Sequence, residues 1–156
     1  MTSASTENIG VRRALQIDAE HISDFNIAMA LETEGKPLDS ETVRGGVRAV
    51  LSRNDLGFYV VAEHRDETVG QLLITYEWSD WRNAFFWWIQ SVYVAPEYRH
   101  QGVYKALHEY VSKAAGSQGD VCGIRLYVDK DNKIAQGVYA GLGMSETNYD
   151  MYEIEF

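Results

Sequence analysis

A cationic loop joins a strand-like run to a helical pattern in the stretch SVYVAPEYRHQGVYKALHEYV, residues 91–111. The start of a helix presents unpaired backbone N–H groups and the positive end of the helix dipole. Arg99, His100 and Lys105 add positive charge there, and Gly102 has no side chain to keep a bulky anion away from the backbone. These features predict a site for a phosphate or pyrophosphate, although an ordinary charged surface loop has the same residues.

The elements that must hold this loop are indicated by the spacing of apolar residues. Their expected order is β-α-α-β-β-β-α-β-α-β. Three strands follow one another without helices between them, so a doubly wound nucleotide-binding fold is excluded. The order predicts a mixed α/β fold, with a mostly antiparallel central sheet, flanking helices and one parallel crossover. Strands are expected at residues 9–16, 57–64, 68–78, 84–94, 121–128 and 144–156, and helices at residues 18–32, 40–52, 102–115 and 132–140.

Length and charge limit the classes of function. The chain has 156 residues, which suits a single domain at residues 9–156 after a disordered tail at residues 1–8. The chain has 14 Lys and Arg residues and 23 Asp and Glu residues. The resulting net charge of −9 disfavours nucleic-acid binding.

The residues that usually mark a compartment or a metal site are sparse. A single cysteine, Cys122, allows no intramolecular disulfide and suits a reducing cytoplasm. No apolar run reaches transmembrane length, and no signal peptide is recognised, so a cytoplasmic protein is expected without a membrane partner. The four histidines have no metal-ligand spacing, and no metal site is expected.

A second motif follows about thirty residues after the cationic loop. In LYVDKDNKIAQGVYAGLGM, residues 126–144, the pattern N-x-x-A-x-x-x-Y-x-x-x-G begins at Asn132 and includes Tyr139. The two blocks resemble the two conserved motifs of the GNAT superfamily, the acetyl-CoA-dependent N-acyltransferases. The loop from Arg99 to Tyr104 is similar to the family's Q/R-x-x-G-x-G/A motif, with Tyr104 where the family usually has Gly or Ala. The resemblance covers nearly the whole chain.

The resemblance implies a GNAT-type fold with acetyl-CoA as cosubstrate. The pantetheine arm would pair with the backbone of Val92 and Val94 and bind Asn132, and the pyrophosphate would bind the amides of residues 100–104. By the same resemblance, the N–H of Val94 would bind the oxyanion, and Tyr139 would protonate the departing thiolate. A phenol with a pKa near 10 is reasonably matched to a thiol with a pKa near 8.5. The residues expected to bind acetyl-CoA are Val92, Val94, Arg99, His100, Gln101, Gly102, Val103, Tyr104, Asn132 and Tyr139.

The general base is less defined. Many family members have an acid on the strand at residues 84–94, but this chain has Gln90, which cannot act as a base. The resemblance places the segment between the first two helices beside the acceptor pocket, which favours Glu34 and Glu32. A solvated or capping role is equally open for each acid. The candidates for the base are Glu34, Glu32, Glu77 and Asp80.

We therefore expect an N-acetyltransferase that transfers the acetyl group to a primary amine by direct attack. Seven acidic residues against one lysine between Ile17 and Thr42 favour a small or terminal cationic amine. The alternative is a non-catalytic acyl-CoA-binding sensor or interaction module. A homodimer is also expected, with the aromatic residues near residues 78–88 as core or dimer contacts. The identity of the amine is not specified by the sequence.

Overall fold

The structure is a computed structural model that describes residues 8–156 of the chain. The predicted tail at residues 1–8 lies outside the described residues except for Asn8. The chain divides into two compact units, one ending at Leu126 and the other formed by Tyr127–Phe156.

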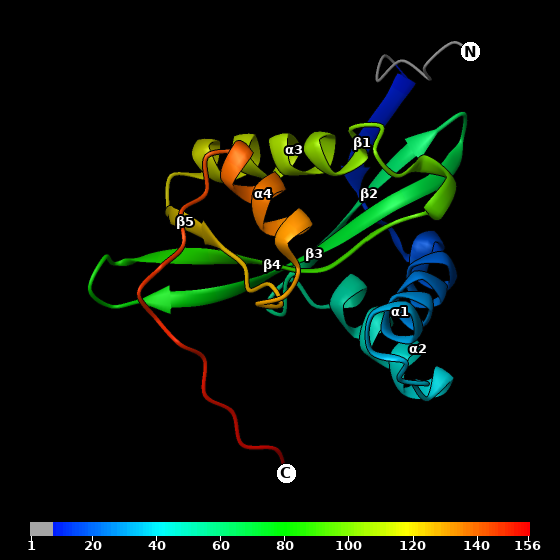
Figure 1. The fold of residues 1–156 in the computed structure, drawn as a ribbon, viewed down its shortest axis with the longest axis horizontal. Helices are drawn as coiled ribbons and strands as arrows, with labels where there is room; N and C mark the ends of the chain where they lie inside the picture. Colours follow the sequence, from blue (N-terminus) through cyan, green and yellow to red (C-terminus); the bar gives the residue numbers. More distant parts are fainter. Residues whose placement is uncertain (1–7) are drawn as a thin grey trace. The chain divides into compact units, whose positions relative to one another are not determined.

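The first unit is built on one five-stranded sheet in the order β1-β2-β3-β4-β5 (Figure 1). Strands β1 to β4 pair antiparallel, and β5 pairs parallel to β4. The predicted meander and parallel crossover are both confirmed. The elements are β1 (Ile9–Arg13), the 3-10 turn η2 (Gln16–Asp18), α1 (Ala19–Glu34), α2 (Ser40–Ser52), β2 (Phe58–His64), β3 (Glu67–Ser79), β4 (Ala84–Val94), the 3-10 turn η3 (Pro96–Tyr98), α3 (Val103–Gln118) and β5 (Val121–Arg125).

The two faces of this sheet are covered by different helices (Figure 1). Helix α3 packs on one face, over a core that includes Val60, Leu72 and Leu107. Helices α1 and α2 cover the other face, where the core includes Ile22 and Val61. Val60 and Val61 are neighbours on β2, and both have 0% exposure, because successive side chains of a strand point to opposite faces.

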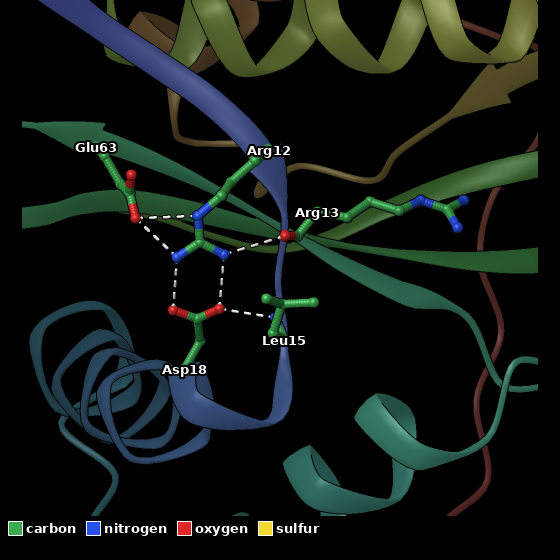
Figure 2. A network of polar contacts seen from close by, with 5 residues as sticks. All are labelled: Arg12, Arg13, Leu15, Asp18 and Glu63. Carbon is green, nitrogen blue, oxygen red and sulfur yellow. Dashed lines mark hydrogen bonds and ion pairs between the residues drawn. The ribbon is translucent and has the colours of Figure 1, made fainter. Parts of the chain in front are cut away.

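A salt-bridge network fixes the start of α1 to the sheet (Figure 2). The guanidinium of Arg12 on β1 donates two hydrogen bonds, of 2.8 and 2.9 Å, to the two carboxylate oxygens of Asp18. It also donates two, of 2.7 and 3.0 Å, to Glu63 on β2. Asp18 accepts another from the backbone N–H of Leu15 at 2.7 Å. Asp18 is the N-cap residue of α1, but its side chain makes no capping hydrogen bond because its carboxylate is bound to Arg12.

The glycine that ends α1 and the two glycines inside α2 have different structural settings. Gly35 adopts a φ of 59° directly after Glu34, as a helix-ending glycine does. Gly45 and Gly46 lie in the middle of α2. A Cβ at either position would meet nothing within 4 Å, so close approach is not the reason for either glycine.

A bulge divides β4 into two halves. The register between β3 and β4 shifts at Leu72, which lies opposite both Ser91 and Val92 of β4. Ser91 has a φ of 51°, a left-handed conformation that is uncommon for a residue with a side chain. Strand β5 pairs with β4 only as far as Trp88, so residues 89–94 of β4 have an open edge on that side.

The second unit contains α4 (Lys133–Gly141) and a segment without regular structure. Asn132 begins the helix, and its side chain accepts a hydrogen bond of 3.1 Å from the N–H of Ala135. The predicted strand at residues 144–156 is not present, and residues 145–156 are all exposed. A strand requires a neighbouring strand for its backbone N–H and C=O groups, and within the described chain this segment has none. None of the described helices has both the length and the apolar character needed to cross a membrane.

Candidate active site

The cationic loop ends in an uncapped helix start, as the sequence predicted. His100 and Gly102 have φ angles of 62° and 80°, and this left-handed pair turns the chain from η3 into α3. The first α-helical hydrogen bond runs from the N–H of Ala106 to the carbonyl of Gly102 at 3.0 Å. The N–H groups of residues 103–105 therefore precede the helical ladder. Since Gly102 has no side chain to cap them, they are available to an anion.

The open edge of β4 presents backbone groups next to this helix start. The N–H of Ala95 donates to the carbonyl of Val69 on β3 at 2.9 Å. Consecutive residues of a strand direct their N–H and C=O groups to opposite edges, so those of Val94 point away from β3. In agreement, the carbonyl of Val94 accepts a hydrogen bond of 2.9 Å from Nε of Arg99, which is not part of β3. The same alternation directs the groups of Val92 to the open edge.

Arg99 and Glu32 form an ion pair between the loop and the end of α1. Nη2 of Arg99 lies 2.8 Å from Oε2 of Glu32, and the two side chains are 40% and 41% exposed. The hydroxyl of Tyr93 on β4 donates to Oε1 of Glu32 at 3.0 Å. The hydrogen bonds from Arg99 and Tyr93 lower the pKa of Glu32. A carboxylate with a lowered pKa binds a proton less readily, so this environment disfavours Glu32 as a base.

Other side chains of the loop and of the first turn of α3 have contacts of their own. Gln101 donates from Nε2 to the carbonyl of Glu97 at 2.9 Å. The Tyr104 hydroxyl lies 3.3 Å from Nδ1 of His108, and its ring packs against the core on the α3 face. The side chain of Val103 is buried in the same core. The side chains of these three residues are therefore engaged in contacts within the protein.

The other acids expected near the acceptor differ in their contacts. Glu77 accepts hydrogen bonds of 2.9 Å from Nε1 of Trp88 and from Nη1 of Arg125. Glu34, in the last turn of α1, is exposed and has no hydrogen bond or ion pair to another described side chain. Gln90 donates to the hydroxyl of Thr75 at 2.6 Å and is held on the sheet.

A cavity of about 270 Å³ lies beside the bulge of β4, between that strand and helices α1 and α2. Behind it, the buried Gln71 on β3 donates from Nε2 to Oδ1 of Asn26 at 2.8 Å and to the carbonyl of Ser91 at 3.2 Å. Its Oε1 has no hydrogen-bond partner among the described residues. An isolated buried acceptor is costly, so a donor is expected to bind there. The lining residues are Asn26, Met29, Ala30, Leu38, Val43, Gly46, Val47, Tyr59 and Ser91.

Both conserved residues of the second motif belong to the second unit, where Asn132 is the N-cap residue of α4 and Tyr139 lies on the helix. They are seven residues apart, or about two helical turns, so they lie on the same side of the helix. Tyr139 is half-buried, and burial raises its pKa above the usual value. The phenol is therefore protonated at neutral pH and can donate a proton.

Sequence reasoning missed the polar residues under the cavity, Asn26 and Gln71, and the contact of Tyr93 with Glu32. One signal was present: Gln71 interrupts the apolar run of residues 69–74, where a polar side chain needs a specific partner. The bulge at Ser91 gave no signal, because a serine at this position is compatible with a regular strand.

Comparisons with known proteins agree with the fold and the two motifs. A sequence model described as the Acetyltransferase (GNAT) family matches residues 20–144. The crystal structure of a possible acetyltransferase from Clostridium difficile 630 is 44% identical, with a TM-score of 0.89 over 96% of this chain and 98% of that chain. No curated protein matches the chain.

Two more distant structures show the fold alone. A ribosomal-protein-alanine N-acetyltransferase from Brucella melitensis biovar Abortus 2308 is 14% identical, with a TM-score of 0.76 over 95% of this chain and 99% of that chain. An aminoglycoside N-acetyltransferase in complex with CoA is 17% identical, with a TM-score of 0.77 over 94% of each chain. The predicted mixed α/β fold of this type is confirmed.

Proposed function

Since the chain belongs to the Acetyltransferase (GNAT) family, which confirms the predicted family and enzyme class, we propose that it acetylates a primary amine by direct attack on acetyl-CoA. The observation that carries the proposal is the open backbone edge of β4 beside the uncapped start of α3. Residues 9–156 act as a single N-acetyltransferase domain in this proposal.

The cosubstrate residues follow from this geometry and from the family motifs. The edge formed by Val92 and Val94 can pair with the amide groups of the pantetheine arm, as an added strand would. The pyrophosphate would bind the N–H groups at the start of α3, with Gly102 allowing close approach. Arg99, His100 and Gln101 flank these groups, followed by Val103 and Tyr104 on α3. Asn132, the N-cap residue of α4, would bind the pantetheine arm.

The reaction requires two proton transfers. The neutral amine nitrogen attacks the thioester carbon and forms the C–N bond, while the N–H of Val94 stabilises the oxyanion. The C–S bond then breaks, and the thiolate takes the proton of the Tyr139 hydroxyl. The proton lost by the amine goes to a carboxylate, directly or through water. The products are the acetylated amine and free CoA.

Glu34 is the carboxylate that best fits the role of base. The pKa of Glu32 is lowered by Arg99 and Tyr93, and Glu77 is bound by Trp88 and Arg125. We expect Glu34→Gln to lower kcat at least tenfold at pH 7 and to leave the dissociation constant of acetyl-CoA unchanged. Glu41→Gln, on the solvent side of α2, is the control. Equal kcat values in the two variants would exclude Glu34, and a loss in Glu77→Gln alone would assign the role to Glu77.

The acceptor is a small cationic amine, bound in the cavity beside the β4 bulge. Most of its lining is apolar, from residues such as Met29, Leu38 and Val43, which suits a carbon chain. Asn26, which lines the cavity, and Gln71, which donates a hydrogen bond to Asn26, have side-chain carbonyl oxygens that can accept from an ammonium group.

Replacement of Tyr139 by Phe tests the proposed reaction. We expect kcat to fall about a hundredfold, because a general acid contributes at least that much. The affinity for acetyl-CoA, measured by calorimetry, should remain that of the wild type. Tyr110→Phe on α3, which also removes one hydroxyl, is the control and should keep full turnover.

The alternative, a non-catalytic acyl-CoA-binding module, gives a different result. Such a protein would bind acetyl-CoA without acetylating any amine, and Tyr139→Phe would change neither property. Unchanged turnover in an active Tyr139→Phe variant would instead contradict the assignment of the acid.

A further inference from the structure

Two arginines approach one aromatic ring at the beginning of β4. The guanidinium carbon of Arg125, on β5, lies 3.6 Å from the centroid of the Phe86 ring. That of Arg82, in the turn between β3 and β4, lies 5.0 Å from the same centroid. A cation is attracted to the face of an aromatic ring, so each contact alone is favourable. Because both distances end at one point, the two positive charges are no further apart than the sum of these distances.

The positive charge of this pair is only partly neutralised. Nη1 of Arg125 lies 2.9 Å from Oε2 of Glu77, whereas Arg82 has no ion pair with any described carboxylate. Asp80, in the same turn, accepts a hydrogen bond from the backbone N–H of Trp81. The two cations therefore share one carboxylate, at a separation comparable with the Debye length of about 8 Å, where like charges still repel each other. Such a pair favours the binding of an anion.

The guanidinium of Arg125 is held in place while part of it is unused. Its Nη1 binds Glu77, and its Nε and Nη2 have no hydrogen bond to another described residue. Glu77 is fixed in turn by Nε1 of Trp88 at 2.9 Å. The Arg125 side chain is 24% exposed, so a ligand can reach it. A positioned guanidinium can donate two parallel hydrogen bonds to a carboxylate or a phosphate, so the geometry suits an oxyanion.

The arginine pair lies on the same face of the sheet as the acceptor cavity. Successive side chains of β4 point to opposite faces, and Trp87 belongs to the core under α3. Phe86 and Trp88 therefore face the side of α1 and α2. Arg125 is the partner of Trp88 in the β4–β5 register, and Ser91, which lines the cavity, follows three residues later. At a rise of about 3.3 Å per residue, these two positions are about 10 Å apart along the strand.

The phosphates of acetyl-CoA do not account for this anion site. In the proposed function the pyrophosphate binds at the start of α3, beyond Val94 at the end of β4. Phe86 precedes Val94 by eight residues, or about 26 Å in an extended strand. The acceptor, bound between these two positions, is the substrate that can reach the arginines.

We propose that Arg82 and Arg125 bind a carboxylate at the far end of the acceptor, so that the substrate is an ω-amino acid with its amine in the cavity. This inference rests on the proposed function, because it assigns a second group of the same acceptor. The carbon chain crosses Trp88 and Gln90, whose side chains on β4 are half-buried. A chain such as that of ε-aminocaproate suits the separation better than the shorter chain of γ-aminobutyrate.

Steady-state kinetics with an acid and its amide test the carboxylate site. We expect ε-aminocaproate to have a KM at least tenfold lower than its primary amide, with a similar kcat, because a charge-assisted hydrogen bond contributes to binding and not to the reaction. Arg125→Gln and Arg82→Gln should each raise the KM of the acid towards that of the amide. γ-Aminobutyrate should differ less from its own amide.

Arg13→Gln is the matched control for these variants. It removes a comparable contact, in which the guanidinium carbon lies 3.8 Å from the centroid of the Phe58 ring. Both KM values should remain those of the wild type. Equal KM values for acid and amide, in a wild-type protein that acetylates both, would overturn the carboxylate site and leave the proposed function intact.

A binding measurement separates this inference from the reaction. Hexanoate has the carboxylate but no amine, so it cannot be acetylated. In NMR spectra of isotope-labelled protein, the Nε–Hε signals of Arg82 and Arg125, assigned from the two Gln variants, should shift saturably with hexanoate and not with hexanamide. The absence of a saturable shift would overturn the proposal even if amines are acetylated. Saturable shifts in a protein that acetylates no amine would support the oxyanion site and contradict the proposed function instead.

Inorganic phosphate distinguishes the two possible sources of the oxyanion. If the carboxylate belongs to the acceptor, phosphate should bind more weakly than hexanoate and should compete with ε-aminocaproate. Tighter binding of phosphate, without competition against the amine substrate, would show that the site serves a free anion and would overturn its assignment to the acceptor.

Discussion

Two arginines in the first unit each bind a carboxylate of the α1 region, one at its start and one at its end. Arg12 binds Asp18 before the first turn, and Arg99 binds Glu32 near the last turn. Both connect the helix region to a strand, through Glu63 on β2 and through the carbonyl of Val94 on β4. The comparison shows how similar ion pairs serve different purposes.

The difference lies in burial and in the number of partners. The Asp18 side chain is only 8% exposed, and all three guanidinium nitrogens of Arg12 donate hydrogen bonds. The Arg99 pair is about two-fifths exposed, and Nη1 of Arg99 has no hydrogen bond to another described residue. We infer that the first network fixes α1, whereas the second can exchange a partner when an anion binds the loop.

Removal of Arg12 should have the largest effect on stability. Arg12→Ala leaves the carboxylate of Asp18 buried without its counter-ion, which costs about 3 kcal/mol of unfolding free energy. For a chain of this size, the expected decrease in melting temperature is about 10 °C. Chemical denaturation measures the first quantity, and scanning calorimetry measures the second. A change as small as that of an exposed arginine variant such as Arg53→Ala would contradict a fixing role.

Removal of Arg99 should instead affect the cosubstrate. Arg99→Ala is expected to raise the KM for acetyl-CoA about tenfold, because the variant could not form the proposed charge-assisted hydrogen bond to the pyrophosphate. The melting temperature without ligand should hardly change, since the pair is exposed. Arg99→Lys, which keeps the charge, should recover part of the affinity. A large loss of stability with an unchanged KM would show that Arg99, like Arg12, stabilises the fold, and it would contradict the inferred difference between the two arginines.

Acid titration should give the smallest difference between the two networks. The Arg12 hydrogen bonds lower the pKa of Asp18 from 3.8, the value of a free side chain. The resulting stabilisation is complete above pH 3.8 and is lost as the pH falls through the lower pKa of the folded state. Asp18→Asn should therefore flatten the loss of stability below pH 3.8 relative to the wild type. Glu32→Gln, at the exposed pair, should leave that slope closer to wild type, and identical slopes in all three proteins would contradict the assignment.

Much of the fold could be predicted because apolar spacing reflects burial. The expected helix at residues 40–52 coincides with α2, and the strand at residues 84–94 coincides with β4. The segment at residues 144–156 has the correct pattern but no strand, because a pattern does not supply a neighbour. The same limit explains β5, which ends at Arg125 where β4 no longer pairs with it.

The candidate site was predictable where it depends on adjacent residues. The turn at Gly102 and the start of α3 lie next to each other in the sequence, so their geometry could be anticipated. The contacts of Glu32 with Arg99 and Tyr93 join residues more than sixty positions apart. These residues come together only because α1 packs against β4, and a local sequence pattern does not indicate contacts between segments so far apart in the chain.

The most direct test of the proposed function is the release of free CoA from acetyl-CoA in the presence of pooled amines. The pools would contain polyamines, aminoglycosides, amino acids and short peptides, with mass spectrometry of any active pool. We predict release above the rate without amine, and a product heavier than one amine by a single acetyl group. If no pool releases CoA above the rate without amine, while acetyl-CoA still raises the melting temperature, the result would contradict amine acetylation and favour a binding module.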